Sequence, residues 1–182
     1  VGDVGITTFR PPYVPVAMGA FAGHHRGKDF RLTRLTPSHV WAEERGAVFV
    51  ETGPWLRAQW FPEPGETDWL QSVTREVIGV RERVGVCDVS TLGKIEVVGP
   101  DAGRMLDFIY ANTFSTLPVG KVRYGVMLRE DGFVFDDGTA ARLADDHYFM
   151  TTTTANAVRV MQNLEFAHQC IWPDLDVQMV SA

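Results

Sequence analysis

Strand-like alternation of apolar and polar residues dominates the second half of the chain. The clearest example is 122–128, where every second residue is apolar or aromatic. Asp-Gly at 131–132 then predicts a tight turn, because glycine readily adopts positive φ. Residues 133–135 begin a return strand, which runs directly into two carboxylates, Asp136 and Asp137. Since Asp is disfavoured inside strands, this pair is the first candidate for chemistry.

Two interpretations of the carboxylate pair remain open at this point. Both side chains can be solvated at a strand end, or one can lie in a cleft and orient or deprotonate a substrate. In a regular strand Asp136 shares a face with Val134, whereas Asp137 shares one with Phe133 and Phe135. Only one of the two carboxylates can then face a pocket, and periodicity does not say which. Because they are adjacent, their titrations are expected to be coupled.

The segments around this hairpin predict a regular order of elements. From residue 93 the order is strand, helix, three strands, helix and strand, with a turn at 145–146 and Thr154 as the N-cap of the second helix. This order predicts an α+β fold, a mainly antiparallel sheet with helices packed on one face. The expected buried stripes are Ala102, Met105, Leu106 and Ile109 in the first helix and Val158, Met161, Leu164 and Ala167 in the second.

The first half of the chain is less regular. A helix is expected to start at 36–38 with Pro37 at its first position, a short strand at 48–51, and a second helix at 68–83, followed by an extended segment at 84–89. The apolar stripe of that second helix is Leu70, Val73, Val77 and Val80. Four tryptophans gather here, at 41, 55, 60 and 69. They can form core, an interface or a stacking wall for a flat ligand, and core is the default.

Composition narrows the classes of protein. The chain has 182 residues, 45% hydrophobic and 22% charged, with a net charge of -6 and no basic run, which argues against binding nucleic acid. No apolar run approaches the roughly 20 residues of a membrane helix, and the residues from Val1 onward lack the basic start and apolar block of a signal peptide. The start at Val1, without Met, suggests a processed or excised piece. Cys87 and Cys170 lack a partner motif, so we expect buried free thiols, no metal site and a cytoplasmic location.

The N-terminal arm has a different character. Residues 1–28 are rich in Pro, Gly and aromatics, which excludes a regular helix. An extended arm with Phe9, Tyr13 and Phe21 must pack on something, either the rest of the chain or a partner. His24 and His25 read as a solvated pair rather than a metal site, since no acidic residue or Cys lies at ligand spacing.

Several short motifs together resemble a known family. They are GVCDVS at 85–90, VGPD at 98–101, YGVML at 124–128 and GFVFDD at 132–137. Their order and spacing are similar to the first half of the tetrahydrofolate-binding aminomethyltransferases, of which the glycine-cleavage T-protein is the best-known member. The resemblance implies a partial T-protein fold, with 36–91 as the start of the folate-binding module and 92–182 as a compact subdomain truncated at its C-terminus. Residues 1–35, an arm or linker, instead resemble the α subunits of heterotetrameric sarcosine oxidases.

The resemblance also implies site residues. The first Asp of the pair, Asp136, corresponds to a catalytic carboxylate at the folate site, and Tyr124 corresponds to a tyrosine lining the same pocket. Leu92 stands where a methionine usually contacts the pterin, and Thr151 and Thr152 stand at pocket-lining positions.

The implied activity is that of one module in a larger oxidase. Oxidation of sarcosine yields an iminium, which tetrahydrofolate traps as methylenetetrahydrofolate. FAD, FMN and NAD are expected elsewhere in the complex, the partners are the other subunits, and the isolated piece is expected to be inactive. The alternatives are a stand-alone folate-dependent aminomethyltransferase, a non-catalytic assembly element, or a tRNA-modifying folate protein, against which the acidic balance weighs.

Overall fold

The computed structural model describes residues 33–182. The chain divides into two units, Val1–Arg34 and Leu35–Ala182, and each is considered by itself. The aromatic side chains of the N-terminal arm, predicted to pack through Phe9, Tyr13 and Phe21, lie outside the described residues, as does the histidine pair. The boundary between the arm and the folate-binding module, and the one inside the module, stay predictions.

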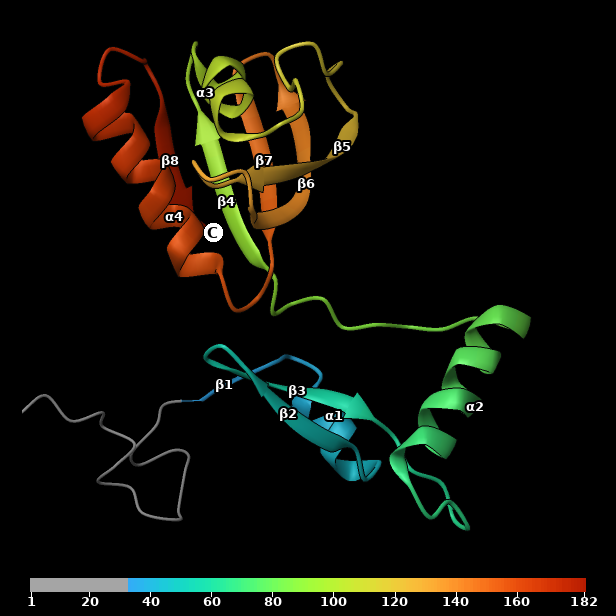
Figure 1. The fold of residues 1–182 in the computed structure, drawn as a ribbon. Coiled ribbons are helices and arrows are strands. Elements are labelled where there is room, and N and C mark those ends of the chain that lie inside the picture. The colour runs from blue at the N-terminus through green and yellow to red at the C-terminus, as the bar shows by residue number, and fades with distance from the viewer. Residues whose placement is uncertain (1–32) are drawn as a thin grey trace, which may run out of the picture. The chain divides into compact units, whose positions relative to one another are not determined.

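The first elements of the described chain form a small sheet with two helices (Figure 1). They are β1 (Arg34–Leu35), α1 (His39–Glu44), β2 (Val48–Thr52), β3 (Trp55–Trp60) and α2 (Trp69–Glu82). The sheet order is β1-β3-β2, and β2 and β3 are antiparallel. The predicted strand and both helices are present. Ser38 is the N-cap of α1, so Pro37 lies before the helix and not at its first position. Strand β3 was not predicted, and it follows β2 through a turn in which Gly53 has a positive φ of 56°.

The later elements confirm the predicted α+β order. They are β4 (Gly93–Val98), α3 (Ala102–Ile109), β5 (Val122–Leu128), β6 (Val134–Ala144), β7 (His147–Thr152), α4 (Ala157–Phe166), the π-helical turn η2 (Ala167–Ile171) and β8 (Gln178–Ser181). They build a five-stranded sheet in the order β5-β6-β7-β4-β8, with every pair antiparallel (Figure 1).

Both helices pack on one face of this sheet. In β4 and β7 the registered pairs Ile95–Met150 and Val97–Tyr148 point to the same side, and all four side chains are buried. They belong to one hydrophobic cluster with the buried residues of α3 and α4. The helical members of the cluster are Ala102, Met105 and Leu106 from α3 and Val160 and Leu164 from α4. We call this side of the sheet the core face.

The N-terminal end of α4 differs from the prediction. Asn156, and not Thr154, is the N-cap residue, and its side chain makes no capping bond within the helix. Thr154 is instead buried and shares a hydrogen bond of 3.0 Å with the hydroxyl of Thr91. Val158, expected in the buried stripe, is 65% exposed, because the helix turns Val160 and Leu164 towards the sheet.

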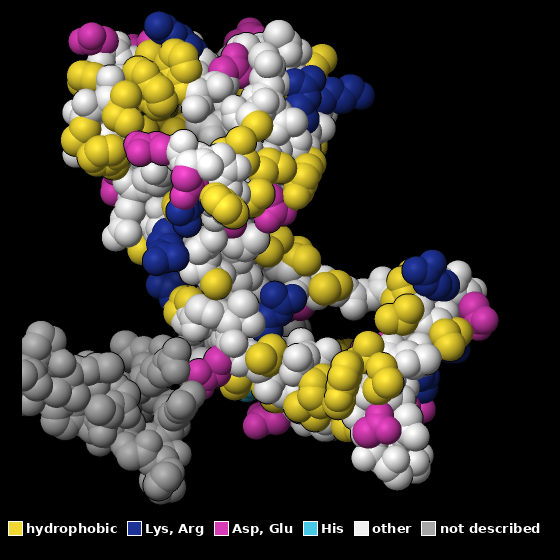
Figure 2. Space-filling model, in the orientation of Figure 1, with side chains coloured by type: hydrophobic (Ala, Val, Ile, Leu, Met, Phe, Trp, Pro, Cys, Tyr) yellow, Lys and Arg dark blue, Asp and Glu magenta, His cyan; other side chains and the backbone are white. Residues whose placement is uncertain are grey.

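The tryptophans and cysteines are more exposed than predicted. Trp41 is 52% and Trp69 58% exposed, and Trp55 and Trp60 are only partly buried, so the default interpretation of a tryptophan core is wrong. Cys87 and Cys170 are free thiols but exposed, which corrects their prediction as buried residues. Figure 2 shows hydrophobic side chains at the surface of the part that carries β2, β3 and α2.

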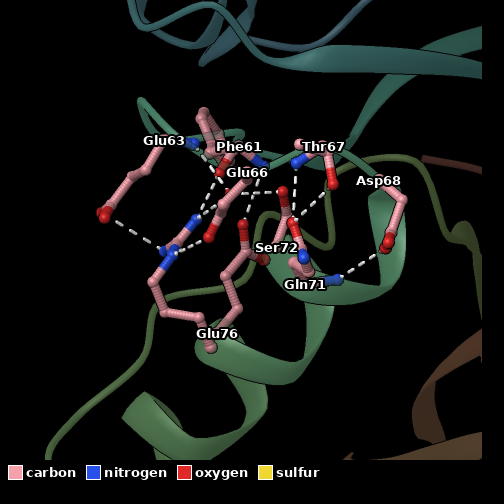
Figure 3. Close-up of polar contacts among 9 residues, drawn as sticks. Phe61, Glu63, Glu66, Thr67, Asp68, Gln71, Ser72 and Glu76 are labelled. Carbon is pink, nitrogen blue, oxygen red and sulfur yellow. Dashed lines mark hydrogen bonds and ion pairs between the residues drawn. The ribbon is translucent and has the colours of Figure 1, made fainter.

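Helix α2 is held by its polar side (Figure 3). Glu66, in the loop before the helix, accepts hydrogen bonds from Arg75 Nε at 2.6 Å and Ser72 Oγ at 2.5 Å. Arg75 also donates to the backbone carbonyl of Phe61 at 2.6 Å, and Asp68 caps the helix through the Gln71 N–H. Three of the four members of the predicted apolar stripe are about half exposed or more, Leu70 at 56%, Val77 at 48% and Val80 at 60%, and Val73 is partly buried.

Replacing Leu164 with Ala should destabilise the chain by about 2–5 kcal/mol, because a fully buried leucine leaves a cavity when truncated. The matched control is Val158→Ala on the exposed side of the same helix, which should change the free energy of unfolding by less than about 0.5 kcal/mol. Urea denaturation measures both. Equal losses for the two variants would contradict the assigned orientation of α4.

The Glu66 cluster predicts an acid-sensitive contribution to stability. Hydrogen bonds from Arg75, then Ser72 and the Glu63 N–H, lower the pKa of Glu66 from 4.5 to about 2. A carboxylate whose pKa is lower in the folded state stabilises the fold fully at pH values above its unfolded pKa. This contribution is lost as the pH falls towards the folded pKa. The difference in unfolding free energy between the wild type and Glu66→Gln should therefore shrink between pH 4.5 and 2.

In an Arg75→Gln variant the unfolding free energy should depend less on pH in the same range, since Arg75 is the main cause of the lowered pKa of Glu66. Unfolding curves of the wild type and Glu66→Gln that stay parallel down to pH 2 would count against this account of the cluster.

Candidate functional site

The β5–β6 hairpin has the register that decides where each candidate residue points. Met127 pairs with Asp136 and Val126 with Asp137, so the two carboxylates lie on opposite faces of the sheet. Met127 is buried in the core, which puts Asp136 on the core face. Asp137 lies on the other side, which we call the open face. By the same alternation the open face carries Lys94, Glu96, Tyr124, Thr139, Phe149 and Thr151.

A β-bulge at Phe135 breaks the regular strand assumed from the sequence. Leu128 pairs with Val134 and Met127 with Asp136, so Phe135 is an extra residue in β6. As a result Val134 and Asp136 do not share an environment: Val134 is 63% exposed and Asp136 only 3%.

Asp136 is a buried carboxylate whose oxygens are already occupied. It accepts hydrogen bonds from the backbone N–H of Thr153 at 3.1 Å and from its hydroxyl at 2.5 Å. Asn156 Nδ2 approaches the same carboxylate at 3.4 Å and donates to the Phe135 carbonyl at 3.0 Å. These bonds tie β6 to the connection between β7 and α4. Asp136 therefore satisfies the polar groups of that connection in the core.

Asp137 and Tyr124 form a pair on the open face. The Tyr124 hydroxyl donates to Asp137 Oδ2 at 2.7 Å, and this hydrogen bond raises the pKa of Tyr124. The tyrosine is 57% exposed and the carboxylate is half-buried. Within residues 33–182, Oδ1 of Asp137 accepts no hydrogen bond, so it is free to accept one from a ligand.

Two threonine hydroxyls lie beside this pair in the sheet. Thr139 is opposite Tyr124 in the register, and its hydroxyl lies 3.0 Å from that of Thr151 on the neighbouring strand β7. The strands approach closely here, because a Cβ on Gly138 would lie 2.0 Å from the carbonyl oxygen of Thr151. The group that approaches Gly138 is the backbone of β7.

The residues predicted from the resemblance do not all come together. Tyr124 and Thr151 lie on the open face, whereas Asp136 and Thr152 face the core at 3% and 2% exposure. Leu92 is half-buried just before β4, and its carbonyl accepts a hydrogen bond from Lys94 Nζ at 2.8 Å. Their common role in one folate pocket stays a prediction.

Sequence reasoning passed over Thr139, and it left open which carboxylate of the pair faces a pocket. The signal that could have identified Thr139 was the hairpin register, since the turn at 131–132 brings it opposite Tyr124. Elsewhere in the described residues, no group of three or more His, Cys, Asp or Glu side chains is arranged to hold a metal. No helix within 33–182 is long and apolar enough to cross a membrane.

Comparison with known structures identifies the fold. The crystal structure of the glycine cleavage system aminomethyltransferase T from Bartonella henselae superposes with a TM-score of 0.67, covering 83% of this chain and 38% of that one at 21% identity. The antiparallel sheet with its helices is therefore part of an aminomethyltransferase T fold.

Sequence comparison identifies the family. The model of the GCVT N-terminal domain matches residues 38–182, and the chain belongs to that family. The sarcosine oxidase subunit alpha of Rhizobium meliloti (strain 1021) is 57% identical over 179 residues, and that of Corynebacterium sp. (strain P-1) is 49% identical. Both alignments cover 98% of this chain but only 18% of the relative. An aminomethyltransferase of Thermotoga sp. (strain RQ2) is 36% identical over 126 residues, 69% of this chain and 31% of that protein.

These comparisons confirm the resemblance at both levels. The family match covers nearly all of the segment assigned to the aminomethyltransferase module. The alignment with the alpha subunits extends over 98% of the chain, so it includes the N-terminal arm as well. The chain spans about a fifth of the length of these alpha subunits.

The two carboxylates should differ in their contributions to stability. Asp136→Ala removes the acceptor of the Thr153 and Asn156 donors and should cost about 2–4 kcal/mol of unfolding free energy. Asp137→Ala removes one partly exposed bond to Tyr124 and should cost less than about 1 kcal/mol. Urea denaturation of the 182-residue chain compares them. The assignment of Asp136 as a buried tie would be wrong if the order were reversed.

Proposed function

We propose that this chain is the tetrahydrofolate-binding part of a sarcosine oxidase α subunit, and that the open face of its five-stranded sheet takes part in the folate site. Two findings support this: the family of the chain and the names of the relatives that align with nearly all of it. The observation that carries the proposal is the accessible Asp137 carboxylate, oriented by Tyr124 on the face of the sheet opposite α3 and α4.

The residues of the open face fit such a ligand. Asp137 offers a free acceptor oxygen, and the hydroxyls of Thr139 and Thr151 can donate or accept hydrogen bonds. The exposed ring of Tyr124 gives a flat surface against which an aromatic ligand can pack. These side chains provide apolar contact and hydrogen bonds in one place. Folate has a flat ring system and many polar atoms, so it can use both.

The site must transfer a proton and position the folate nitrogen against the one-carbon donor. Tetrahydrofolate supplies the nitrogen nucleophiles that take up the one-carbon unit, and methylenetetrahydrofolate is the product. The substrate carbon arrives as the iminium of oxidised sarcosine and leaves its amine behind as glycine. No electrons are transferred in this step, since the oxidation precedes it. The Asp137 carboxylate accepts the proton that the attacking nitrogen loses and returns it to the departing amine, while its charge favours the cationic iminium.

Asp136 is the competing assignment. The resemblance implies the first carboxylate, but its oxygens are occupied by Thr153 and Asn156 and its side chain is buried. A carboxylate that must accept a proton from a ligand has to be reachable. The geometry therefore supports Asp137, with Asp136 holding the strand beneath it.

The rest of the activity belongs to other parts of the proposed complex. Oxidation of sarcosine with oxygen as acceptor requires the flavins, FAD and FMN, and with NAD we expect them outside this module, together with the other subunits of a heterotetramer. A separate chain of residues 1–182 would then lack oxidase activity. Cys87 and Cys170 are free thiols, which fits a complex in the reducing cytoplasm.

A second candidate is a stand-alone folate-dependent aminomethyltransferase. The 36% identity with a Thermotoga protein of that name favours it. The open-face site would serve both functions, because each needs a folate nitrogen brought to a one-carbon donor. The higher identity with the alpha subunits, over nearly the whole chain, favours the oxidase.

The experiment uses the full oxidase and measures both products, formaldehyde and methylenetetrahydrofolate. Asp137→Asn should leave sarcosine oxidation near the wild-type rate and lower the share of methylenetetrahydrofolate about 10²-fold or more, the usual loss of a general base. Asp136→Asn should lower stability and keep the product ratio. Asp131→Asn, in the exposed hairpin turn, is the control.

The opposite outcome is equally clear. If Asp137→Asn still channels the one-carbon unit to folate while a folded Asp136→Asn variant does not, the first carboxylate is the functional one. If neither variant changes the ratio, the open face is not the folate site.

A further inference from the structure

A groove runs along α4 on the side that faces the β5–β6 turn. Two adjoining hollows of about 560 and 420 Å³ share Arg129, Phe135 and Asn163, so they form one continuous depression. This size is within the range of small-molecule sites, about 300–1,000 Å³. We call it the α4 groove, and its principal lining residues are Arg129, Val134, Phe135, Arg159, Asn163 and Phe166.

The groove is built by fixed elements. One wall is a single side of α4, because Arg159, Gln162, Asn163 and Phe166 follow the spacing of one helical face. The other wall is the bulged start of β6, where the carbonyl of Phe135 accepts the Asn156 hydrogen bond at 3.0 Å. Bulges commonly change the direction of side chains next to binding sites, and here the bulge contributes Val134 and Phe135 to this wall.

Arg159 is exposed at a place where a bound anion would be favourable. It lies in the first turn of α4, where the helix dipole opposes a positive charge and where the structure has no acidic residue. Within residues 33–182, no carboxylate forms an ion pair with it. A guanidinium presents a planar fork that matches a carboxylate, and the Gln162 and Asn163 amides add donors on the same face.

The charged residues make the two ends of the groove electrostatically different. Arg129 is paired with Asp131, and with Glu130 these residues line the outer hollow. An anion is therefore repelled at that end and attracted to the end with Arg159. Between these ends lie two exposed apolar side chains, Val134 at 63% and Phe166 at 57% exposure. The arrangement suits a carboxylate attached to a compact apolar body.

We infer that the α4 groove is a binding site for a small aromatic carboxylate, whose carboxylate group pairs with Arg159 and whose ring packs on Phe135 and Phe166. The site is separate from the open face, because α4 packs on the core face of the sheet and Asp137 points away from it. Its occupancy does not depend on the proposed folate chemistry.

The test is titration of the ¹⁵N-labelled 182-residue chain with benzoate, followed by chemical shifts. Saturable shifts are expected at Arg159, Gln162, Asn163 and Phe166. Benzylamine, which has the same ring and the opposite charge, should not saturate, and inorganic phosphate should bind at least tenfold more weakly than benzoate. These two probes separate the need for an anion from the need for an apolar body.

Arg159→Gln should weaken benzoate binding at least tenfold. Its unfolding transition should stay at or above that of the wild type, since the variant removes a positive charge from the start of a helix. Arg104→Gln, an exposed arginine of α3 that lies 3.9 Å from Asp101, is the matched control and should bind as the wild type does.

Three results would overturn the inference. They are benzoate shifts that do not saturate, benzylamine or phosphate binding as tightly as benzoate, and equal affinities of the Arg159→Gln and Arg104→Gln variants.

Discussion

The hydrogen bonds received by Asp136 hold the site region together. They join the start of β6 to the chain that leaves β7 for α4, and Asn156 adds a second tie through the Phe135 carbonyl. Two surfaces depend on this junction. On one side of the sheet it sets the direction of Asp137 towards Tyr124, and on the other it fixes the wall of the α4 groove. A buried charge is costly unless its partners are complete, so the three donors must be present together.

Alternation and turn chemistry predicted much of the fold. The order from β4 to β8 and the turn at Gly132, with its φ of 83°, followed from local rules that the tertiary structure does not override. The N-cap of α4 was missed because Thr154 and Asn156 are both good caps, and only the buried contact with Thr91 distinguishes them. The site was less predictable, because one extra residue at Phe135 changes the environment on either side of it without leaving a mark on the periodicity.

Helix α2 illustrates the opposite difficulty. Its apolar spacing correctly predicted a helix, yet the side that packs is polar and depends on Arg75 and Glu66. Amphipathic periodicity reports which face is apolar, but burial of that face requires something to cover it. The charged residues of α2 attach the helix to the end of β3, with Glu76 receiving the Phe61 N–H at 2.7 Å.

The bulge at Phe135 also limits how this part of the chain can change in length. Side chains of a strand alternate with a period of two, so a one-residue change in length that the bulge does not take up would exchange the faces of the two carboxylates. The accessible acid would then enter the core, and the tie to Thr153 would point to solvent. Substitutions in this segment can be absorbed singly, whereas a change in length that shifts the register alters the surroundings of both carboxylates at once. Chain length is therefore under as strong a constraint here as residue identity.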